Sequence, residues 1–302
     1  MGADVRLRAL DPGRDRPLLE RLWAAALGPV WPLLPGGLDI VRDGIVAERR
    51  DSGGKDGAAL GMVAVDPAGS IPLLLVDPAH QRRGVGTRLL EAGLARLGEV
   101  GTVTVGLGSG GDDYIWPGVP DDLPAAAGFF SARGWRFEHT VVDLTADLRG
   151  CRAPAGVGER PGRAGVSIEV MAERHRAEVL DFEAATFPEW VVWFERLGAS
   201  VLAAHDRAGA IVGTLLFRGP PGATIYTPLL GQEAGTIGCV GVAAAARGAG
   251  VGSAMVARAS ELLRDGGTGT CHIGWTRRER FYARLGYVPW RRYHMARRPT
   301  RS

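Results

Sequence analysis

The feature that most constrains this 302-residue chain is a glycine-rich motif that occurs twice. The first copy reads Gln-Arg-Arg-Gly-Val-Gly over residues 81–86, and the second reads Arg-Gly-Ala-Gly-Val-Gly over residues 247–252. Each copy follows a short apolar run and precedes a segment with helical periodicity. A strand, a glycine turn and a helix N-terminus together present unpaired backbone N–H groups to an anion, usually a phosphate. The repeat therefore predicts one anion-binding turn in each half of the chain.

The repeat also predicts how the chain is divided. A domain has about 150 residues on average, so the length alone suggests two domains. We expect an N-terminal domain over residues 1–145, a linker over residues 146–165 and a C-terminal domain over residues 166–302. The linker segment is rich in Gly, Pro and Arg and has no apolar periodicity. In both halves strand-like runs alternate with amphipathic helical segments, which is typical of an α/β fold.

Composition narrows the class of protein. Hydrophobic residues make up 46% and charged residues 23% of the chain, and no apolar run reaches the ~18 residues of a membrane span. The net charge of +3 is small and the basic residues are scattered, which argues against nucleic-acid binding. There is no signal-peptide pattern. Cys151, Cys239 and Cys271 lack metal-ligand spacing, so we expect no metal site and reduced thiols in a cytoplasmic protein. We also expect a monomer or homodimer.

A second repeated pattern lies downstream of each turn. It is an aromatic pair followed by glycine and another aromatic residue, and it covers residues 129–135 and residues 281–287. Neither turn continues as a nucleotide-triphosphatase motif, and neither lies in the first strand-helix unit as in a dinucleotide fold. With both elements present, the chain resembles the GNAT superfamily of acyl-CoA N-acyltransferases, in which the glycine turn wraps the pyrophosphate of coenzyme A. The resemblance covers nearly the whole chain apart from the linker.

The resemblance implies an α/β fold of two tandem GNAT-like domains, each a mixed, mostly antiparallel twisted sheet with helices on both faces. It also implies acetyl-CoA as the cofactor. In the C-terminal half, the residues expected to bind it are Val240, Val242, Arg247, Gly248, Ala249, Gly250, Val251, Gly252 and Ser253. In the N-terminal half, they are Val76, Gln81, Arg82, Arg83, Gly84, Val85, Gly86 and Thr87.

Acetyl transfer from a thioester to an amine needs a neutral nucleophile, a stabilised oxyanion and a protonated thiol leaving group. In the family a tyrosine in the aromatic pair commonly supplies that proton, and Tyr282 occupies this place. Phe130 occupies it in the N-terminal half and has no proton to donate. We therefore expect a catalytic C-terminal domain and an N-terminal domain that binds cofactor or is purely structural. The alternative for Tyr282 is an aromatic ring that packs its helix onto the sheet.

The general base is harder to assign. Many relatives place a glutamate eleven residues before the turn, but Thr236 and Ser70 stand there. Glu233 and Glu189 are nearby candidates, and a chain of water molecules is an equal alternative.

Two segments suggest where the acceptor binds. The stretch between the turn and the aromatic pair is longer in the N-terminal half, and its loop carries Tyr114 and Trp116, whose rings could stack on a sugar. Their alternative role is to cover the edge of a core. In the C-terminal half, Glu189, Trp190 and Trp275 are the expected substrate-binding residues.

These segments resemble tandem-domain enzymes that acetylate glucosamine and glucosaminides. We therefore expect an acetyl-CoA-dependent N-acetyltransferase in which a small primary amine, such as an amino sugar, attacks the thioester directly. A mycothiol synthase-like enzyme and a protein N-acetyltransferase are alternatives with the same chemistry. A non-catalytic acetyl-CoA sensor is the alternative from a different class, because fold alone does not establish a substrate.

Overall fold

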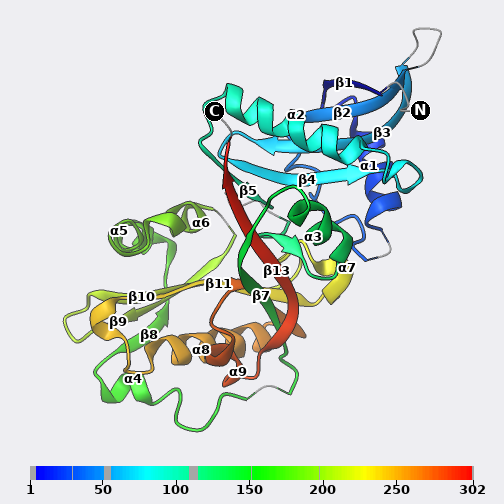
Figure 1. Cartoon of the computed structure of the whole chain (residues 1–302). Coiled ribbons are helices and arrows are strands. Elements are labelled where there is room, and N and C mark those ends of the chain that lie inside the picture. Colours follow the sequence, from blue (N-terminus) through cyan, green and yellow to red (C-terminus); the bar gives the residue numbers. More distant parts are fainter. Residues whose placement is uncertain are drawn as a thin grey trace. The chain divides into compact units, whose positions relative to one another are not determined.

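A computed structural model describes residues 5–28, 30–50, 56–108, 115–150, 152–196 and 198–300. The chain forms two compact units (Figure 1). Unit 1 consists of Met1–Val141 together with Arg292–Ser302, and unit 2 consists of Val142–Arg291. Each unit has its own buried core and contributes its own run of strands to a 13-stranded sheet, so the predicted α/β fold with tandem GNAT-like domains is confirmed.

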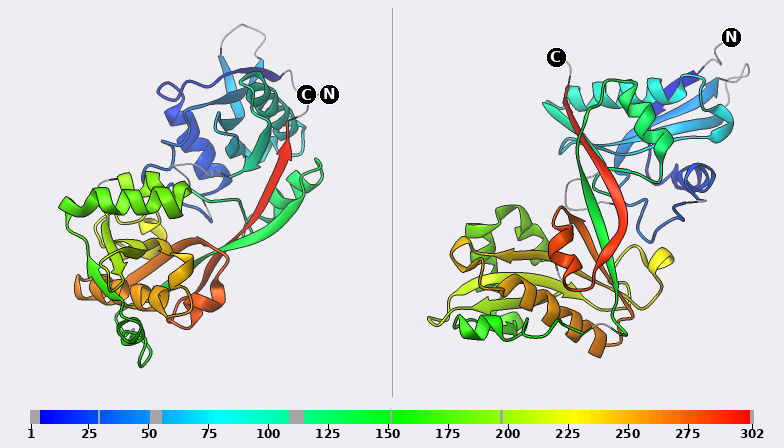
Figure 2. Two further views of the ribbon diagram at one scale, coloured as in Figure 1. Left: turned by 90° about the vertical axis from the view of Figure 1, so that its left-hand side faces the viewer. Right: turned by 60° about the horizontal axis from the view of Figure 1, so that its bottom comes forward.

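The sheet of unit 1 has the strand order β1-β2-β3-β4-β5-β13, and β4 and β5 are its parallel pair. Helices α1 and α2 cover opposite faces of this sheet (Figures 1 and 2). The strands are β1 (Val5–Ala9), β2 (Asp43–Arg50), β3 (Asp56–Asp66), β4 (Ser70–Val76), β5 (Thr104–Leu107) and β13 (Val288–Pro299), and the short β6 (Val119–Pro120) pairs with β13. The helices are α1 (Arg16–Ala26), α2 (Val85–Glu99) and α3 (Pro124–Ser131).

Strand β3 shows why the apolar runs of this half are continuous. Val63 and Val65 point toward α2, because a Cβ added at Gly93 of that helix would meet their methyl groups at 3.3 Å. Met62 and Ala64 alternate with them and are equally buried. A strand that is covered on both faces needs apolar residues at every position, which explains the unbroken run.

The sheet of unit 2 has the order β7-β12-β11-β10-β9-β8, and its parallel pair is β11 with β12. Its strands are β7 (Phe137–Asp147), β8 (Ser167–Val170), β9 (Ser200–His205), β10 (Ile211–Arg218), β11 (Ala234–Val242) and β12 (Thr270–Thr276). Its helices are α4 (Arg160–Arg163), α5 (Arg176–Thr186), α6 (Val191–Glu195), α7 (Thr227–Leu230), α8 (Val251–Asp265) and α9 (Glu279–Ala283). Within the part of the chain described above, none of the helices has the length and apolarity needed to cross a membrane.

Helices α5 and α8 lie on opposite faces of the unit 2 sheet, as the alternation along β10 shows. Leu215 is fully buried in the same core as Met255 of α8. The preceding residue, Thr214, points the other way and donates a hydrogen bond to Glu183 of α5. One face of the sheet therefore carries the large apolar core, and the other carries a polar contact with α5.

The last strand of each half differs from the expected division. The C-terminal domain was predicted to extend to residue 302, but Arg297 and Arg298 of β13 pair with Gly106 and Val105 of β5 in unit 1. In return, β7 leaves unit 1 after Val141 and pairs with β12 of unit 2. Each unit thus receives its final strand from the other half of the sequence. Periodicity identifies a strand but not its partner, which is why the predicted bounds are wrong here.

The segment predicted as a linker is also partly structured. Ala146 pairs with Cys271 in the sheet, and Leu148 and Val157 are buried in the core of unit 2. The short helix α4 follows and packs against α8. Residues 146–165 are therefore largely part of unit 2, because the few apolar residues among the glycines and prolines are enough to hold the segment in place.

The exchanged strands predict that fragments cut at the wrong boundary will fold poorly. Residues 142–291 should unfold cooperatively when expressed alone, whereas residues 166–302 should be less stable and aggregate. The second fragment loses buried Leu144 and Leu148, each contributing about 1.5–3 kcal/mol, and exposes β12 as a sheet edge. Size-exclusion chromatography and thermal unfolding followed by circular dichroism compare the two. Equal or greater stability of 166–302 would contradict the strand assignment.

Candidate active site

The two glycine turns have the same backbone conformation. Gly84 has φ +82° and begins α2, and Gly250 has φ +81° and begins α8. This left-handed conformation is one that glycine adopts without a steric penalty. Helices α2 and α8 each have 15 residues, so each turn presents the N-terminus of a long helix. Both turns therefore leave the backbone N–H groups of a helix N-terminus facing outward, which is the arrangement that anion-binding turns use.

The first residue of each motif closes its turn onto the preceding strand. Gln81 Nε2 donates to the carbonyl oxygen of Val76 at 3.2 Å, and Arg247 Nε donates to the carbonyl oxygen of Val242 at 2.9 Å. In both units that carbonyl belongs to the last residue of the strand before the turn. The equivalent bonds explain why a long side chain with an N–H donor stands at this position of the motif.

The last glycine of each motif, Gly86 or Gly252, lies against the aromatic pair. A Cβ added at Gly86 would lie 3.2 Å from the ring of Phe129, and one added at Gly252 would lie 3.6 Å from the ring of Phe281. The first aromatic residue of each pair therefore packs directly on the first turn of the motif helix. This contact links the two sequence patterns, which are far apart along the chain, in one structure.

The parallel strands of unit 2 separate beside the turn. Their last paired residues are Ile237 of β11 and Ile273 of β12, although both strands continue. Cys239 and Trp275, which follow these residues, each have φ +48°, and the pairing of both strands with their outer neighbours changes register there. Beyond these residues β11 and β12 no longer pair with each other, so an extended ligand could pair with β11 as an additional strand.

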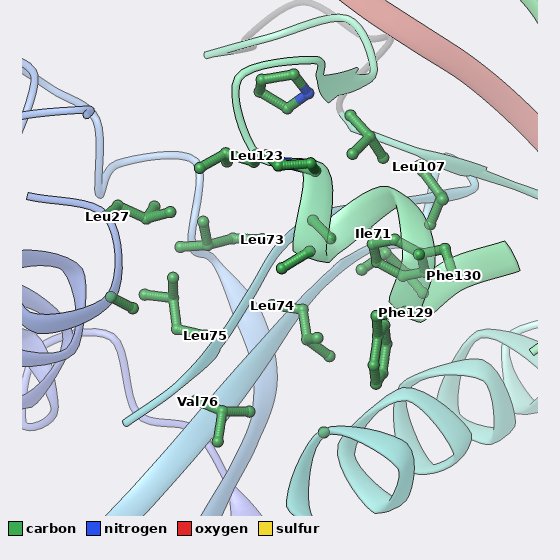
Figure 3. A pocket seen from close by; sticks show the side chains of 18 of the residues that line it. Leu27, Ile71, Leu73, Leu74, Leu75, Val76, Leu107, Leu123, Phe129 and Phe130 are labelled. Carbon is green, nitrogen blue, oxygen red and sulfur yellow. The ribbon is translucent and has the colours of Figure 1, made fainter. Parts of the chain in front are cut away.

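The parallel strands of unit 1 separate in the same way. Their pairs are Ser70 with Gly106 and Ile71 with Leu107, and the rest of β4 has no partner in β5. A cavity of about 920 Å³ begins here, lined by β4, β5, α3 and the turn (Figure 3). Its wall is mostly aliphatic and aromatic, and Phe130 stands where the other half has a tyrosine.

Tyr282 lies on α9 next to Phe281, whose ring packs on the turn of unit 2. The tyrosine is only 7% exposed, and among the described residues its hydroxyl has no hydrogen-bond partner. Burial raises its pKa to about 12, Arg278 opposes this, and Cys239 of the separated strand adds to it. The hydroxyl is therefore protonated at neutral pH and lies close to β11, as a proton donor to a thiolate requires.

Glu183 was missed by the sequence reasoning. It lies on the buried face of α5 one turn after Val179, and its side chain is fully buried. Thr214 donates a hydrogen bond to Oε1, while Oε2 has no partner among the described residues. Burial raises the pKa of Glu183 to about 7, and the nearby charge of Glu189 contributes. A carboxylate at an apolar helix position was the available signal, since such positions rarely carry charge without a reason.

Glu233 is not placed where a general base is needed. It precedes β11, six residues before Cys239, which is roughly 20 Å along a strand. Its carboxylate is 64% exposed and forms an ion pair with Arg149 at 2.9 Å. The prediction of Glu233 as base is therefore not supported, because the strand carries it away from the separated segment of β11 and β12.

The predicted acceptor residues of unit 2 lie around that segment. Phe187 packs on β11, since a Cβ added at Gly241 would meet its ring at 2.4 Å, and Trp190 stacks on Phe187 at 4.8 Å between centroids. Glu189 is exposed beside them. Trp275 is held by its backbone N–H, which donates to Asp143 at 2.7 Å. The loop between α5 and α6 thus lies against the end of β11.

The acceptor residues predicted in unit 1 are Tyr114 and Trp116. Tyr114 lies outside the described residues. Trp116 is 6% exposed and its ring contacts Trp23 at 5.8 Å and Trp31 at 5.0 Å between centroids. Trp31 in turn donates its indole N–H to Asp122. The ring of Trp116 is therefore part of a buried tryptophan cluster, as in the alternative role of covering a core edge, and it also lines the cavity of unit 1.

A cation from the predicted linker lies on the turn of unit 2. Carbons of the Arg160 side chain lie 3.1 and 3.2 Å from where a Cβ at Gly250 would be. No described residue pairs with the Arg160 guanidinium, and the side chain is exposed. Gly84 in unit 1 has no atom within 4 Å of the corresponding position. An unpaired cation beside an anion-binding turn favours a phosphate ligand in unit 2.

Comparisons with known proteins agree with this geometry. A sequence model described as "Acetyltransferase (GNAT) domain" matches residues 193–289, and one described as "Acetyltransferase (GNAT) family" matches residues 41–110. A mycothiol acetyltransferase of Parafrankia sp. is 30% identical over 81% of this chain and 80% of its own length. The chain belongs to the GNAT family of acetyltransferases. The expected identity as a tandem-domain N-acetyltransferase is thereby confirmed.

Other relatives of this GNAT protein agree. A mycothiol acetyltransferase of Clavibacter sepedonicus is 30% identical over 71% of this chain and 67% of its own. Among solved structures, a glucosamine N-acetyltransferase region of a fungal multi-domain β-N-acetylglucosaminidase has a TM-score of 0.87 and 27% identity. It covers 99% of this chain, which matches 38% of the fungal one. A tandem GNAT protein from the clavulanic acid pathway, at 18% identity and TM-score 0.64, has the same fold.

The contact of Arg160 with Gly250 predicts a role in cofactor affinity. Arg160→Ala should raise the KM for acetyl-CoA roughly two- to fivefold, the range of an exposed ion pair, with little change in kcat. Arg163→Ala is the matched control, because Arg163 lies on the same short helix and pairs with Glu159 at 2.8 Å. Steady-state kinetics at varied acetyl-CoA measure both. An equal effect of the two substitutions would contradict the role of Arg160.

Proposed function

We propose that this GNAT enzyme transfers the acetyl group of acetyl-CoA to a small primary amine, with an amino sugar as acceptor, in the active site of unit 2. The observation that carries the proposal is the position of Tyr282, a buried and unpaired phenol beside the separated strands and the glycine turn. In this proposal the turn at Gly250 binds the pyrophosphate, and the pantetheine lies between β11 and β12.

The residues of this chain would divide the chemistry as follows. The acceptor nitrogen attacks the thioester carbon, and the backbone N–H groups freed at the separated end of β11 stabilise the oxyanion. The carbon–sulfur bond then breaks, and Tyr282 gives its proton to the departing thiolate. Because the pKa of Tyr282 is about 12, the hydroxyl retains its proton until the thiolate is formed.

The acceptor proposal has two supports. The fungal neighbour is named as a glucosamine N-acetyltransferase region, and the match covers 99% of the present chain. The loop with Glu189 and Trp190 offers a carboxylate and an aromatic face, which suit a cationic sugar. A mycothiol-type acceptor, an amine carried on a larger molecule, is the second candidate, because the curated relatives are named mycothiol acetyltransferases.

For unit 1 we propose a non-catalytic site that binds the same cofactor. The turn at Gly84 and the cavity beside it support cofactor binding, and Phe130 supports the absence of catalysis. The guanidinium of Arg133 is bonded to Thr87 at the start of α2 and lies over the ring of Phe129. It would supply in unit 1 the cation that Arg160 supplies in unit 2.

The test of the function is thiol release from acetyl-CoA with a panel of amines: glucosamine, glucosaminides, the amine precursor of mycothiol, and a peptide with a free N-terminus. We expect the highest kcat/KM with an amino sugar. Faster turnover of the mycothiol precursor would select the second candidate, and faster turnover of the peptide would contradict a small-molecule acceptor. If none of these amines releases thiol, the proposed acceptor class is wrong.

The role of Tyr282 predicts that Tyr282→Phe lowers kcat roughly ten- to ten-thousand-fold, the effect of losing a positioned acid, with little change in acetyl-CoA affinity. Tyr287→Phe is the matched control, because Tyr287 is also buried but its hydroxyl is bonded to Ser260 at 2.7 Å. That control should lower stability by about 1 kcal/mol and leave kcat nearly unchanged. Normal turnover by Tyr282→Phe would remove Tyr282 from the mechanism.

The two turns allow a second matched comparison. Gly250→Glu and Gly84→Glu place the same side chain at nearly identical positive φ angles, so both should incur the same backbone cost of about 1–2 kcal/mol, and Gly250→Glu must also displace the side chain of Arg160. Gly250→Glu should abolish transfer by placing a carboxylate where the pyrophosphate binds, while Gly84→Glu should retain most of it. Turnover and thermal unfolding are measured for both. Loss of activity in folded Gly84→Glu would contradict a non-catalytic unit 1.

A further inference from the structure

We propose that Glu183 of α5 is the general base that takes the proton from the acceptor amine. This inference rests on the proposed function of unit 2 and deepens it, because it assigns the proton transfer that Tyr282 cannot perform. A tyrosine that must donate a proton to sulfur at the end of the reaction cannot also accept one at its start. A second group of opposite protonation state is needed.

The position of Glu183 follows from the bulge in β11. The pairs on either side of the bulge are Thr214 with Gly241 and Leu216 with Gly238, so two residues of β11 lie opposite one residue of β10. Glu183 accepts the hydrogen bond of Thr214 and is therefore held beside the bulge. A bulge redirects the backbone, and here it does so where β11 leaves β12.

The proposed acid and base lie near this segment of β11 from opposite faces of the sheet, Glu183 from the face covered by α5 and Tyr282 from the core beside α8. Cys239 lies at the bulge, and its thiol pKa is raised by burial first and then by the charges of Glu183 and Glu189. The same Cys239 raises the pKa of Tyr282. Glu183, Cys239 and Tyr282 are thus electrostatic neighbours, although they come from α5, β11 and α9.

The side chain of Glu183 has an unused acceptor. Its Oε2 is buried and has no hydrogen-bond partner among the described residues, which costs free energy in a molecule without a ligand. An amine that reaches this oxygen would satisfy it. The charged and titratable groups that act on the carboxylate are Glu189 at the start of the acceptor loop and Cys239, and Thr214 contributes its hydroxyl.

Two other titratable groups of unit 2 are less suited. Glu233 lies near the opposite end of β11 and is paired with Arg149. His272 Nε2 lies 3.2 Å from Asp143 Oδ2. His272 pairs with Thr236 in the part of the sheet where β11 and β12 are still joined, before they separate. The burial of Glu183 also gives it the appropriate basicity, because a pKa of about 7 lets it act as base near neutral pH.

The proton balance is complete with these two residues. A neutral amine attacks, and Glu183 takes one proton from its nitrogen as the carbon–nitrogen bond forms. The carbon–sulfur bond breaks, and the thiolate takes the phenolic proton of Tyr282. The proton on Glu183 then returns through solvent to the tyrosinate, so that both residues recover and the products are amide and thiol.

The experiment measures the pH dependence of kcat/KM with an alkoxyamine acceptor, which is already neutral over the whole range and adds no titration of its own. Wild type should lose activity as the pH falls through the pKa of Glu183. Glu183→Gln should lower kcat roughly 100- to 10,000-fold, abolish this acidic limb and leave acetyl-CoA affinity unchanged. Glu178→Gln, on the exposed side of the same helix, is the control and should resemble wild type.

Two neighbouring substitutions should move the acidic limb in opposite directions. The bond from Thr214 lowers the pKa of Glu183, so Thr214→Val should shift the limb to higher pH. The charge of Glu189 raises that pKa, so Glu189→Gln should shift the limb to lower pH. Both variants retain the Glu183 carboxylate, so they report on its titration even if Glu183→Gln does not fold.

Stability gives a readout that does not depend on activity. The folded-state pKa of Glu183 is raised from 4.5 to about 7, so burying its ionised form destabilises the fold. This cost is absent below the unfolded pKa, grows as the pH rises and is complete above the folded pKa. Glu183→Gln mimics the protonated form, so its melting temperature relative to wild type should increase from pH 5 to pH 8.

The outcomes separate the two levels of the proposal. If wild type releases no thiol with any amine, the proposed function fails and the role of Glu183 fails with it. If wild type is active but Glu183→Gln keeps its rate and its acidic limb, the role of Glu183 alone is overturned. A changed melting temperature with no shift of the limb in Thr214→Val or Glu189→Gln would make Glu183 structural and also overturn the inference.

Discussion

The separation of two parallel strands is the constraint on which both units depend. Backbone N–H and C=O groups inside a folded protein need hydrogen-bond partners, and β11 beyond Ile237 does not obtain them from β12. The cost is acceptable only where a ligand or solvent supplies the missing partners. Two features lie beside the separated strands. The glycine turn after β11 has the geometry to bind an anion, and the bulge in β11 changes the direction of the strand where it leaves β12.

The two units share a framework but differ in chemistry. In both, a glycine of the motif helix packs on the first ring of the aromatic pair, so the next residue of the pair is carried to the same place. Unit 2 has a hydroxyl there in Tyr282, and unit 1 has only the ring of Phe130. The common framework preserves packing in either case, which allows one copy to lose a reactive group without losing its fold.

Local patterns in the sequence predict the turns, the aromatic pairs, Tyr282 and most elements, because each depends on residues close together in the chain. The features that were missed depend on tertiary contacts. Glu183 becomes notable only when α5 covers Thr214, and the distance of Glu233 from the separated strands becomes clear only from the length of β11. Trp116 could not be distinguished from a binding residue until its tryptophan neighbours were known.

The exchanged strand has a consequence for biosynthesis. Unit 1 contains residues from the start of the chain, yet β5 receives its partner from Arg297 and Arg298, and Thr300 bonds to the carbonyl oxygen of Val103. A ribosome that has made every other part of unit 1 must still translate all of unit 2 before that edge is covered. The N-terminal unit is thus the last to be completed, the reverse of the usual order for domains emerging in sequence. During that interval β5 is an open edge, and its protection depends on how quickly the second half is made and folds.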